Sequence, residues 1–253
     1  MKTIIVGLTI ILLAVNAQAS TYREKRELNM TANGIQGLDI SCGAGALVLE
    51  GNPQQDIKVD AEIEIKGLSD KKAKEFIRDK IELSLERKGS VAYLKSKINN
   101  GFWGSKDAQV NLIVTLPPHL NLKIDDGSGS IQLRHMDGEV NIKDGSGSIE
   151  VNDTKGNLTI VDASGSIDVR NIQGDVTVKD GSGSISANKI GGDLTLMDGS
   201  GSIEVKGVDG GVLVNDGSGS IDIHDVQKDV TIESDGSGSC NVSGVKGGIF
   251  RRD

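Results

Sequence analysis

A five-residue motif, Asp-Gly-Ser-Gly-Ser, occurs seven times in the second half of the chain, once with alanine in its second place. The copies begin at positions 126, 144, 162, 180, 198, 216 and 235, so the spacing is 18 residues five times and 19 residues once. A fixed period of this length is typical of stacked, structurally equivalent units. The repeat therefore predicts an elongated array of units that share one continuous core.

Apolar residues occupy the same places in every unit. Two of them are separated by one residue early in the unit and two more later in it, which is the alternation of a β-strand. In the first unit these pairs are Ile131 with Leu133 and Val140 with Ile142. Glycines between the pairs allow the backbone conformations of tight turns. Each unit is thus predicted to contain two short strands and two turns.

The fold that stacks such units is an all-β parallel β-solenoid (β-helix), with one 18-residue coil per unit and two strands per coil. Equivalent strands of neighbouring coils would pair in parallel about 4.8 Å apart. Branched aliphatic side chains would fill the thin interior, and Phe250 is the only aromatic residue beyond position 125. An antiparallel array of hairpins is the alternative, because Asp-Gly is a common hairpin-turn dipeptide.

Residues 1–19 have the features of a secretory signal peptide. Lys2 precedes a short apolar run, and a small-residue cleavage sequence ends at Ala19. The run is too short to predict a membrane span, so we expect no transmembrane segment in the mature chain. The protein is expected to be exported, to the periplasm, the cell surface or the medium. The mature chain has 27 basic and 36 acidic side chains, a net charge of −9 that argues against nucleic acid as a partner.

The mature chain divides into a less regular part and the repeats. Residues 20–125 are expected to form a divergent, strand-rich first portion of the solenoid, with one short helix near residues 70–80 that follows Ser69. Residues 126–253 are expected to form seven coils, with residues 250–253 as a C-terminal cap. Charged residues at such an end protect exposed strand edges from aggregation.

The two cysteines lie far apart in the predicted rod. Cys42 belongs to a glycine-rich corner ahead of the repeats, and Cys240 replaces the core isoleucine of the last coil. A disulfide requires Cα atoms within about 7 Å of each other. We therefore predict no intramolecular disulfide.

The first residue of every motif copy is aspartate, and stacking places these residues in one column. Carboxylates about 5 Å apart repel each other by roughly 3–4 kcal/mol at an effective dielectric constant of 20. Calcium between the coils would remove this repulsion, which makes the column a candidate metal site. The alternative is that each carboxylate caps its own Gly-Ser turn and directs its charge into water. The column consists of Asp126, Asp144, Asp162, Asp180, Asp198, Asp216 and Asp235.

Phe102 and Trp103 form a candidate partner-binding site. They are adjacent in a glycine- and asparagine-rich segment between expected strands, and Trp103 is the only tryptophan of the chain. Tryptophan is enriched at binding hot spots. The alternative is that the pair closes the N-terminal opening of the solenoid.

The sequence gives no sign of catalysis. The serine-rich corners supply hydroxyl groups, but His119, His135 and His224 do not recur with them, and a nucleophilic serine needs a base. The sequence has no Gly-x-Ser-x-Gly, His-Glu-x-x-His or phosphate-loop motif. We therefore expect that the protein is not an enzyme.

The signal peptide, the strand-rich start, the sequence Val114 to Pro118 and the Asp-Gly-Ser-Gly-Ser-Ile coils together resemble the bacterial putative-adhesin family of β-strand-repeat domains. The resemblance covers about residues 35–253. It implies a right-handed parallel β-helix of the cell envelope with an adhesin-like binding or scaffolding function. An envelope protein or a glycan is the expected partner. No cofactor is expected other than calcium, and the alternative function is a calcium-binding structural rod.

Overall fold

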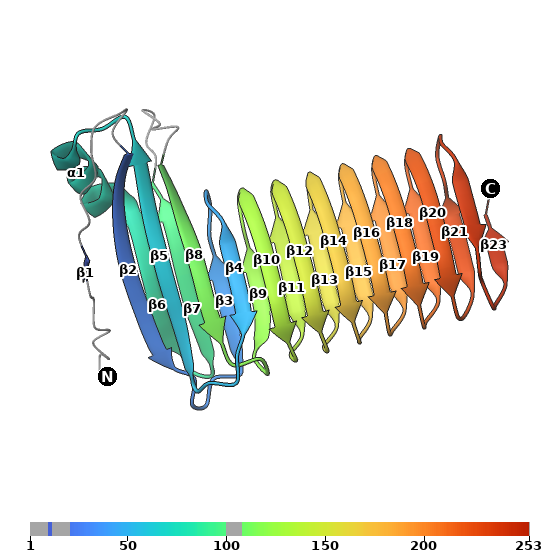
Figure 1. Ribbon diagram of the computed structural model, residues 1–253, viewed down its shortest axis with the longest axis horizontal. Helices are drawn as coiled ribbons and strands as arrows, with labels where there is room; N and C mark the ends of the chain where they lie inside the picture. The colour runs from blue at the N-terminus through green and yellow to red at the C-terminus, as the bar shows by residue number, and fades with distance from the viewer. Residues whose placement is uncertain (1–9, 12–20, 100–107, 253) are drawn as a thin grey trace.

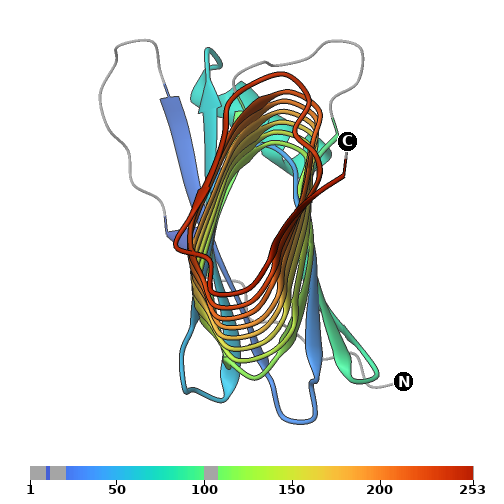
Figure 2. The ribbon, with the colours of Figure 1, turned by 90° about the vertical axis from the view of Figure 1, so that its right-hand side faces the viewer.

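The computed structural model describes residues 10–11, 21–99 and 108–252. The described chain forms an elongated stack of coils (Figure 1). Viewed along the stack, the repeated coils superimpose as a flattened ring (Figure 2). A 12-stranded sheet and an 11-stranded sheet form its two long sides. The signal peptide expected over residues 1–19 lies, except for residues 10–11, outside the described residues.

Each coil of the repeat region contributes one long strand to the first sheet and one short strand to the second. The long strands are β10 (Gly129–Met136), β12 (Gly147–Thr154), β14 (Gly165–Ile172), β16 (Gly183–Ile190), β18 (Gly201–Val208) and β20 (Gly219–Val226). The short strands are β11 (Val140–Asp144), β13 (Leu158–Asp162), β15 (Val176–Asp180), β17 (Leu194–Asp198), β19 (Val212–Asp216) and β21 (Val230–Ser234). The last coil contains β22 (Cys240–Ser243) and β23 (Ile249–Arg251).

Equivalent strands pair in parallel with an offset of one repeat. Ile131 aligns with Ile149 of the next coil, and Val140 aligns with Leu158. The apolar places of β10 to β21 are buried between the two sheets. The predicted parallel β-solenoid of 18-residue coils, with two strands per coil, is therefore confirmed, and the hairpin alternative is wrong for the repeats.

Glycine is required where each coil enters its long strand. At this corner Gly183 has a φ of +144°, and a Cβ added to it would lie 1.6 Å from the carbonyl oxygen of Gly165 in the preceding coil. Non-bonded atoms do not approach each other so closely. The stacking of the coils therefore excludes a side chain at this position.

The N-terminal part extends both sheets. Its strands are β1 (Ile10–Ile11), β2 (Thr21–Thr31), β3 (Gly37–Ser41), β4 (Leu47–Gly51), β5 (Asp56–Lys66), β6 (Ile81–Lys88), β7 (Val91–Ile98), β8 (Ala108–Leu116) and β9 (Asn121–Asp125). β3 and β4 form a further coil, which pairs in parallel with β9 and β10 on one side and with β7 and β8 on the other. The outer pairs β2 with β5, β5 with β8 and β6 with β7 are antiparallel. The N-terminal end of the solenoid thus consists of antiparallel strand pairs.

One helix, α1 (Asp70–Lys80), packs on this end. Ala73 and Ile77 are buried, and Phe76 is partly buried against the core. Ser69 precedes the helix in an extended conformation, although its side chain makes no capping hydrogen bond. The predicted short helix is confirmed. No helix of the described residues is long and apolar enough to cross a membrane.

The last coil carries a charge at a core position. Arg251 aligns with the buried Ile232, and its Nη2 atom donates a hydrogen bond of 3.3 Å to the carbonyl oxygen of Cys240. Phe250 beside it is 53% exposed. Cys240 belongs to this last coil and so lies at the opposite end of the repeat stack from Cys42. Neither cysteine forms a disulfide.

Candidate functional site

The motif aspartates point into the solenoid at one corner. Asp144 follows Val140 and Ile142 on the buried face of β11 and pairs in register with Asp162. Asp235, in the last coil, differs because its side chain is 44% exposed and lies 3.8 Å from Arg251. The six buried members, none more than 7% exposed, are Asp126, Asp144, Asp162, Asp180, Asp198 and Asp216. We call these six the aspartate column.

One oxygen of each column carboxyl caps the turn that follows it. Oδ1 of Asp144 accepts hydrogen bonds from the backbone N–H groups of Gly145 (2.7 Å) and Ser146 (3.3 Å). The other five Oδ1 atoms each accept at least one such bond. All six Oδ2 atoms are buried without a hydrogen-bond partner. The capping expected from the sequence is confirmed, but the expectation that the charge points into water is wrong, because the column faces the interior.

Burial raises the pKa of every carboxyl in the column, and the pKa of Asp144 and of Asp198 rises to about 6. Ionised neighbours about 4.8 Å apart would repel each other by roughly 3 kcal/mol at an effective dielectric constant of 20. The column therefore favours neutral carboxyls or a bound counter-ion. Among the described residues, no three His, Cys, Asp or Glu side chains are grouped to hold a metal ion. Calcium binding by the motif aspartates stays a prediction.

Cys42 takes the aspartate's place in the coil of β3 and β4. Ser41 aligns with Asp125 and Leu47 aligns with Ile131, so the corner between them is a degenerate copy of the motif. Burial, followed by the charge of Asp126, raises the pKa of the Cys42 thiol. The thiol therefore extends the column as a neutral group.

Phe102 and Trp103 lie outside the described residues. Their interpretation as a partner-binding site, and the alternative that they plug the solenoid, both stay predictions.

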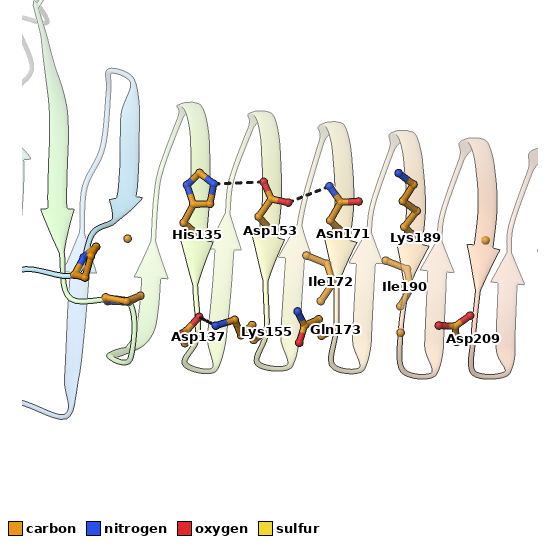
Figure 3. Close-up of a pocket in the computed structure, with 15 residues that line it drawn as sticks. His135, Asp137, Asp153, Lys155, Asn171, Ile172, Gln173, Lys189, Ile190 and Asp209 are labelled. Atoms are coloured by element: carbon orange, nitrogen blue, oxygen red, sulfur yellow. Dashed lines mark hydrogen bonds and ion pairs between the residues drawn. The ribbon is translucent and has the colours of Figure 1, made fainter.

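A groove of about 840 Å³ follows the turns where the long strands lead into the short strands (Figure 3). Five successive coils line it, and Gly51, Pro53 and Pro118 line its N-terminal end. Two rows of side chains border the groove. The first row is His135, Asp153, Asn171, Lys189 and Gly207, and the second row is Asp137, Lys155, Gln173, Gly191 and Asp209.

The first row has an unusual backbone. Its residues have φ values from +55° to +73°, which is the left-handed region. Glycine, asparagine and aspartate tolerate this region best, so Lys189 and His135 are unexpected there. The same place is also left-handed beyond the groove, at Asp225 and Gly244, so the conformation belongs to every coil. The groove differs because His135 and Lys189 hold this conformation there.

Several groove side chains are held by one another. Nδ1 of His135 lies 2.7 Å from Oε1 of Glu50, and its Nε2 lies 3.6 Å from Oδ2 of Asp153. Asn171 donates a hydrogen bond of 3.0 Å from Nδ2 to Oδ1 of Asp153. In the second row, Nζ of Lys155 lies 3.0 Å from Oδ1 of Asp137. The groove therefore has polar walls that are organised before any ligand binds.

Sequence reasoning missed this groove. The signal lay in the place of the unit that holds His135, Asp153, Asn171 and Lys189, because its residue type changes from coil to coil while the core places do not. That place is glycine or aspartate in the other coils, residues that adopt positive φ easily. The pattern indicated an outward-facing turn but not a concave surface.

Asp222, His224 and Ser243 form a short chain of contacts on β20 and β22. His224 lies 2.8 Å from Oδ1 of Asp222 through Nε2 and 2.5 Å from the Ser243 hydroxyl through Nδ1. Acyl-transfer catalysis also needs donors for an oxyanion and a space that holds the substrate. These three residues lie on the outer surface of a sheet and do not line the groove. The trio by itself is therefore not evidence of an active site.

The solved structures that are similar to this chain include the following three. A putative adhesin from Bacteroides fragilis matches 94% of this chain and all of its own, with 14% identity and a TM-score of 0.45. A putative adhesin from Parabacteroides distasonis matches 90% of this chain and 96% of its own, with 12% identity and a TM-score of 0.40. A putative cell adhesion protein from Clostridium sporogenes matches 91% of this chain and 99% of its own, with 13% identity and a TM-score of 0.35.

No family model and no curated protein matches the sequence. The identities and TM-scores of the three structures are too low to support an argument about binding. Two of the three similar structures are thus putative adhesins and the third is a putative cell adhesion protein.

Proposed function

We propose that the protein is a non-catalytic, exported binding or scaffolding module with an adhesin-like role, and that a partner of the cell envelope lies along the groove. The observation that carries this proposal is a groove bordered by two rows of mostly polar side chains from five successive coils. A binding site is a concave surface with a few well-placed polar groups. The groove has this character over a length that suits an elongated partner.

The rigidity of the surroundings supports a binding role. Each coil is hydrogen-bonded to the next through both sheets, and the groove lies between their strands. A surface that is organised in advance loses less conformational freedom when it binds. The apolar start of the chain and its small-residue cleavage sequence support export.

Filling the groove is expected to abolish retention of the partner. We choose Gly207→Lys, because a Cβ at Gly207 meets no atom closer than 3.9 Å and Lys189 occupies the same place one coil earlier. Gly67→Lys is the matched control, since Gly67 also has a positive φ and open space around it but lies in a turn after β5. Both changes are expected to cost about 1–2 kcal/mol of stability.

The measurement is capture from solubilised bacterial envelopes, with captured proteins and sugars quantified. The wild type and Gly67→Lys should retain the same companion, and Gly207→Lys should lose it. Equal retention by all three proteins, or no companion with the wild type, would contradict the proposal.

A calcium-loaded structural rod is the second candidate. Six buried Oδ2 atoms without a hydrogen-bond partner favour it, because each of these oxygens could coordinate a cation. Calcium prefers six to eight oxygen ligands, and consecutive aspartates offer few of them. We therefore place this function second.

A further inference from the structure

The centre of the groove carries two uncharged amides. Asn171 in the first row and Gln173 in the second belong to the middle coil of the five (Figure 3). The Asn171 amide already donates to Asp153, so its carbonyl oxygen remains able to accept. Among the described residues, the exposed Gln173 side chain has no hydrogen-bond partner. A side-chain amide both donates and accepts hydrogen bonds, as a hydroxyl group does.

The backbone of the groove has little left to offer an extended peptide. Its turn N–H groups donate to carbonyl oxygens of the preceding coil, through Lys155 to Met136, Gln173 to Thr154, Gly191 to Ile172 and Asp209 to Ile190. Peptides that add a strand to a sheet need an unpaired edge. The groove runs across the strands and has no such edge along its described length.

The side chains also argue against a protein anchor. Ile172 and Ile190 are only 1% exposed, and no aromatic residue is among the described lining residues. The accessible apolar residues, Pro53 and Pro118, lie at the N-terminal end of the groove. Hot spots of protein interfaces are enriched in aromatic residues that fill pockets. The two rows that border the groove are mostly polar, and the isoleucines between them are already packed in the core.

The charges of the groove are mostly satisfied within it. Asp137 is paired with Lys155, and His135 lies between Glu50 and Asp153. In the described part of the chain, Lys189 and Asp209 have no ion-pair partner. With a neutral His135, the lining holds three carboxylates and two lysine ammonium groups, a net charge of −1. A strongly anionic or cationic polymer would therefore find little net attraction.

We propose that the ligand of the groove is a linear, uncharged glycan, held at its centre by the amides of Asn171 and Gln173. This inference rests on the proposed function. Five coils about 4.8 Å apart span roughly 19 Å along the stack, so the ligand contacts the groove through several sugar units. The hydroxyl groups of the sugars exchange hydrogen bonds with the two amides and with the carboxylates beside them.

The test is affinity electrophoresis in native gels that contain dextran, a soluble β-glucan or a galactomannan, with alginate as the acidic comparison. We expect at least one neutral polysaccharide to retard the wild type more than alginate does. Gln173→Ala should weaken that retardation on the order of fivefold, the loss of about one hydrogen bond. Gln227→Ala is the matched control, since Gln227 holds the same place in a coil beyond the groove lining.

Asn171→Gly provides a second variant, because glycine suits the φ of +55° at this position and removes only the amide. Circular dichroism verifies the fold of each variant. The glycan inference is overturned if alginate retards the protein more strongly, or if Gln173→Ala and Asn171→Gly bind as the wild type does. It is also overturned if no neutral polysaccharide retards the wild type, but Gly207→Lys still loses an envelope protein in the capture experiment. In that case the proposed function stands. Failure of both experiments would remove both proposals.

Discussion

Gly183→Ala is expected to destabilise the solenoid by more than about 4 kcal/mol, beyond the range of ordinary substitutions. The new Cβ would overlap the carbonyl oxygen of Gly165, and the φ of +144° is one that L-residues rarely adopt. Two coils would have to separate to relieve the overlap, and each coil is stabilised mainly by its neighbours. Urea unfolding followed by circular dichroism measures the effect.

Gly67→Ala is the control for this experiment. Gly67 has a φ of +77°, and an added Cβ meets nothing within 4 Å, so only the backbone penalty remains. We expect a loss on the order of 1 kcal/mol at this position. Similar urea midpoints for the two variants would show that the coils do not stack as closely at this corner as the structure indicates.

Raising the pH from about 5 to about 7.5 is expected to lower the stability of the folded chain. The carboxyls of the aspartate column have a higher pKa in the folded chain than in the unfolded chain, to about 6 for Asp144 and Asp198. At pH values between the unfolded and the folded pKa, the folded chain therefore binds more protons than the unfolded chain does. Stability is greatest below the unfolded pKa and is lost as the pH rises through the folded pKa. Discounted for solvent screening, we expect a loss of roughly 2–4 kcal/mol, measured by urea unfolding at each pH.

The variant Asp144→Asn with Asp198→Asn should lose most of this pH dependence. Asparagine keeps an oxygen that accepts the turn N–H bonds and has no charge, so the variant should equal or exceed the wild type at about pH 7.5. Asp60→Asn, which changes an exposed carboxylate on β5, is the control and should behave as the wild type does. A wild type whose stability rises over this pH range would contradict the account.

Calcium gives the competing outcome of the same experiment. If calcium occupies the column, it will raise the melting temperature of the wild type at about pH 7.5 and will not raise that of the double variant. If protons neutralise the column, added calcium and a chelator will leave both melting temperatures unchanged.

The repeat region could be predicted in detail because each position of the unit recurs in seven copies, and equivalent positions share one environment. Ile131 and its equivalents keep one residue type, so a single assignment to the core holds for every coil. The same reasoning placed the glycine corners, and the short helix followed from its own local pattern. Parallel pairing then required only that equivalent strands stack.

The antiparallel end could not be predicted in the same way. β5 pairs with β2 and with β8, which lie at long and unequal distances along the chain, and only β6 and β7 form a local hairpin. The strand positions were readable from alternation, whereas the pairing depends on which surfaces meet in space. The corner at Cys42 was readable as a degenerate coil, but the cysteine in the place of the aspartate gave no sign that it continues the column.

The burial of the aspartate column and the groove were not predicted, for two different reasons. Asp144 belongs to the buried face because it lies two residues after Ile142, a parity that was available in the sequence. Aspartate at a glycine-rich turn is usually solvated. The prediction therefore placed the carboxylates in water, although their position in the alternation placed them on the buried face. The groove lies beside the left-handed residues of the first row, and no hydrophobic pattern indicates a concave surface there.

Hydrogen exchange followed by mass spectrometry, with and without solubilised envelope glycan, tests the central claim most directly. Exchange reports the protection of backbone amides segment by segment. We predict that the glycan slows exchange in the turns that line the groove, residues 135–137, 153–155, 171–173, 189–191 and 207–209. Exchange at the glycine corners on the other side of the coils should remain unchanged. Protection confined to another surface, or no protection at any segment, would contradict the assignment of the groove as the binding site.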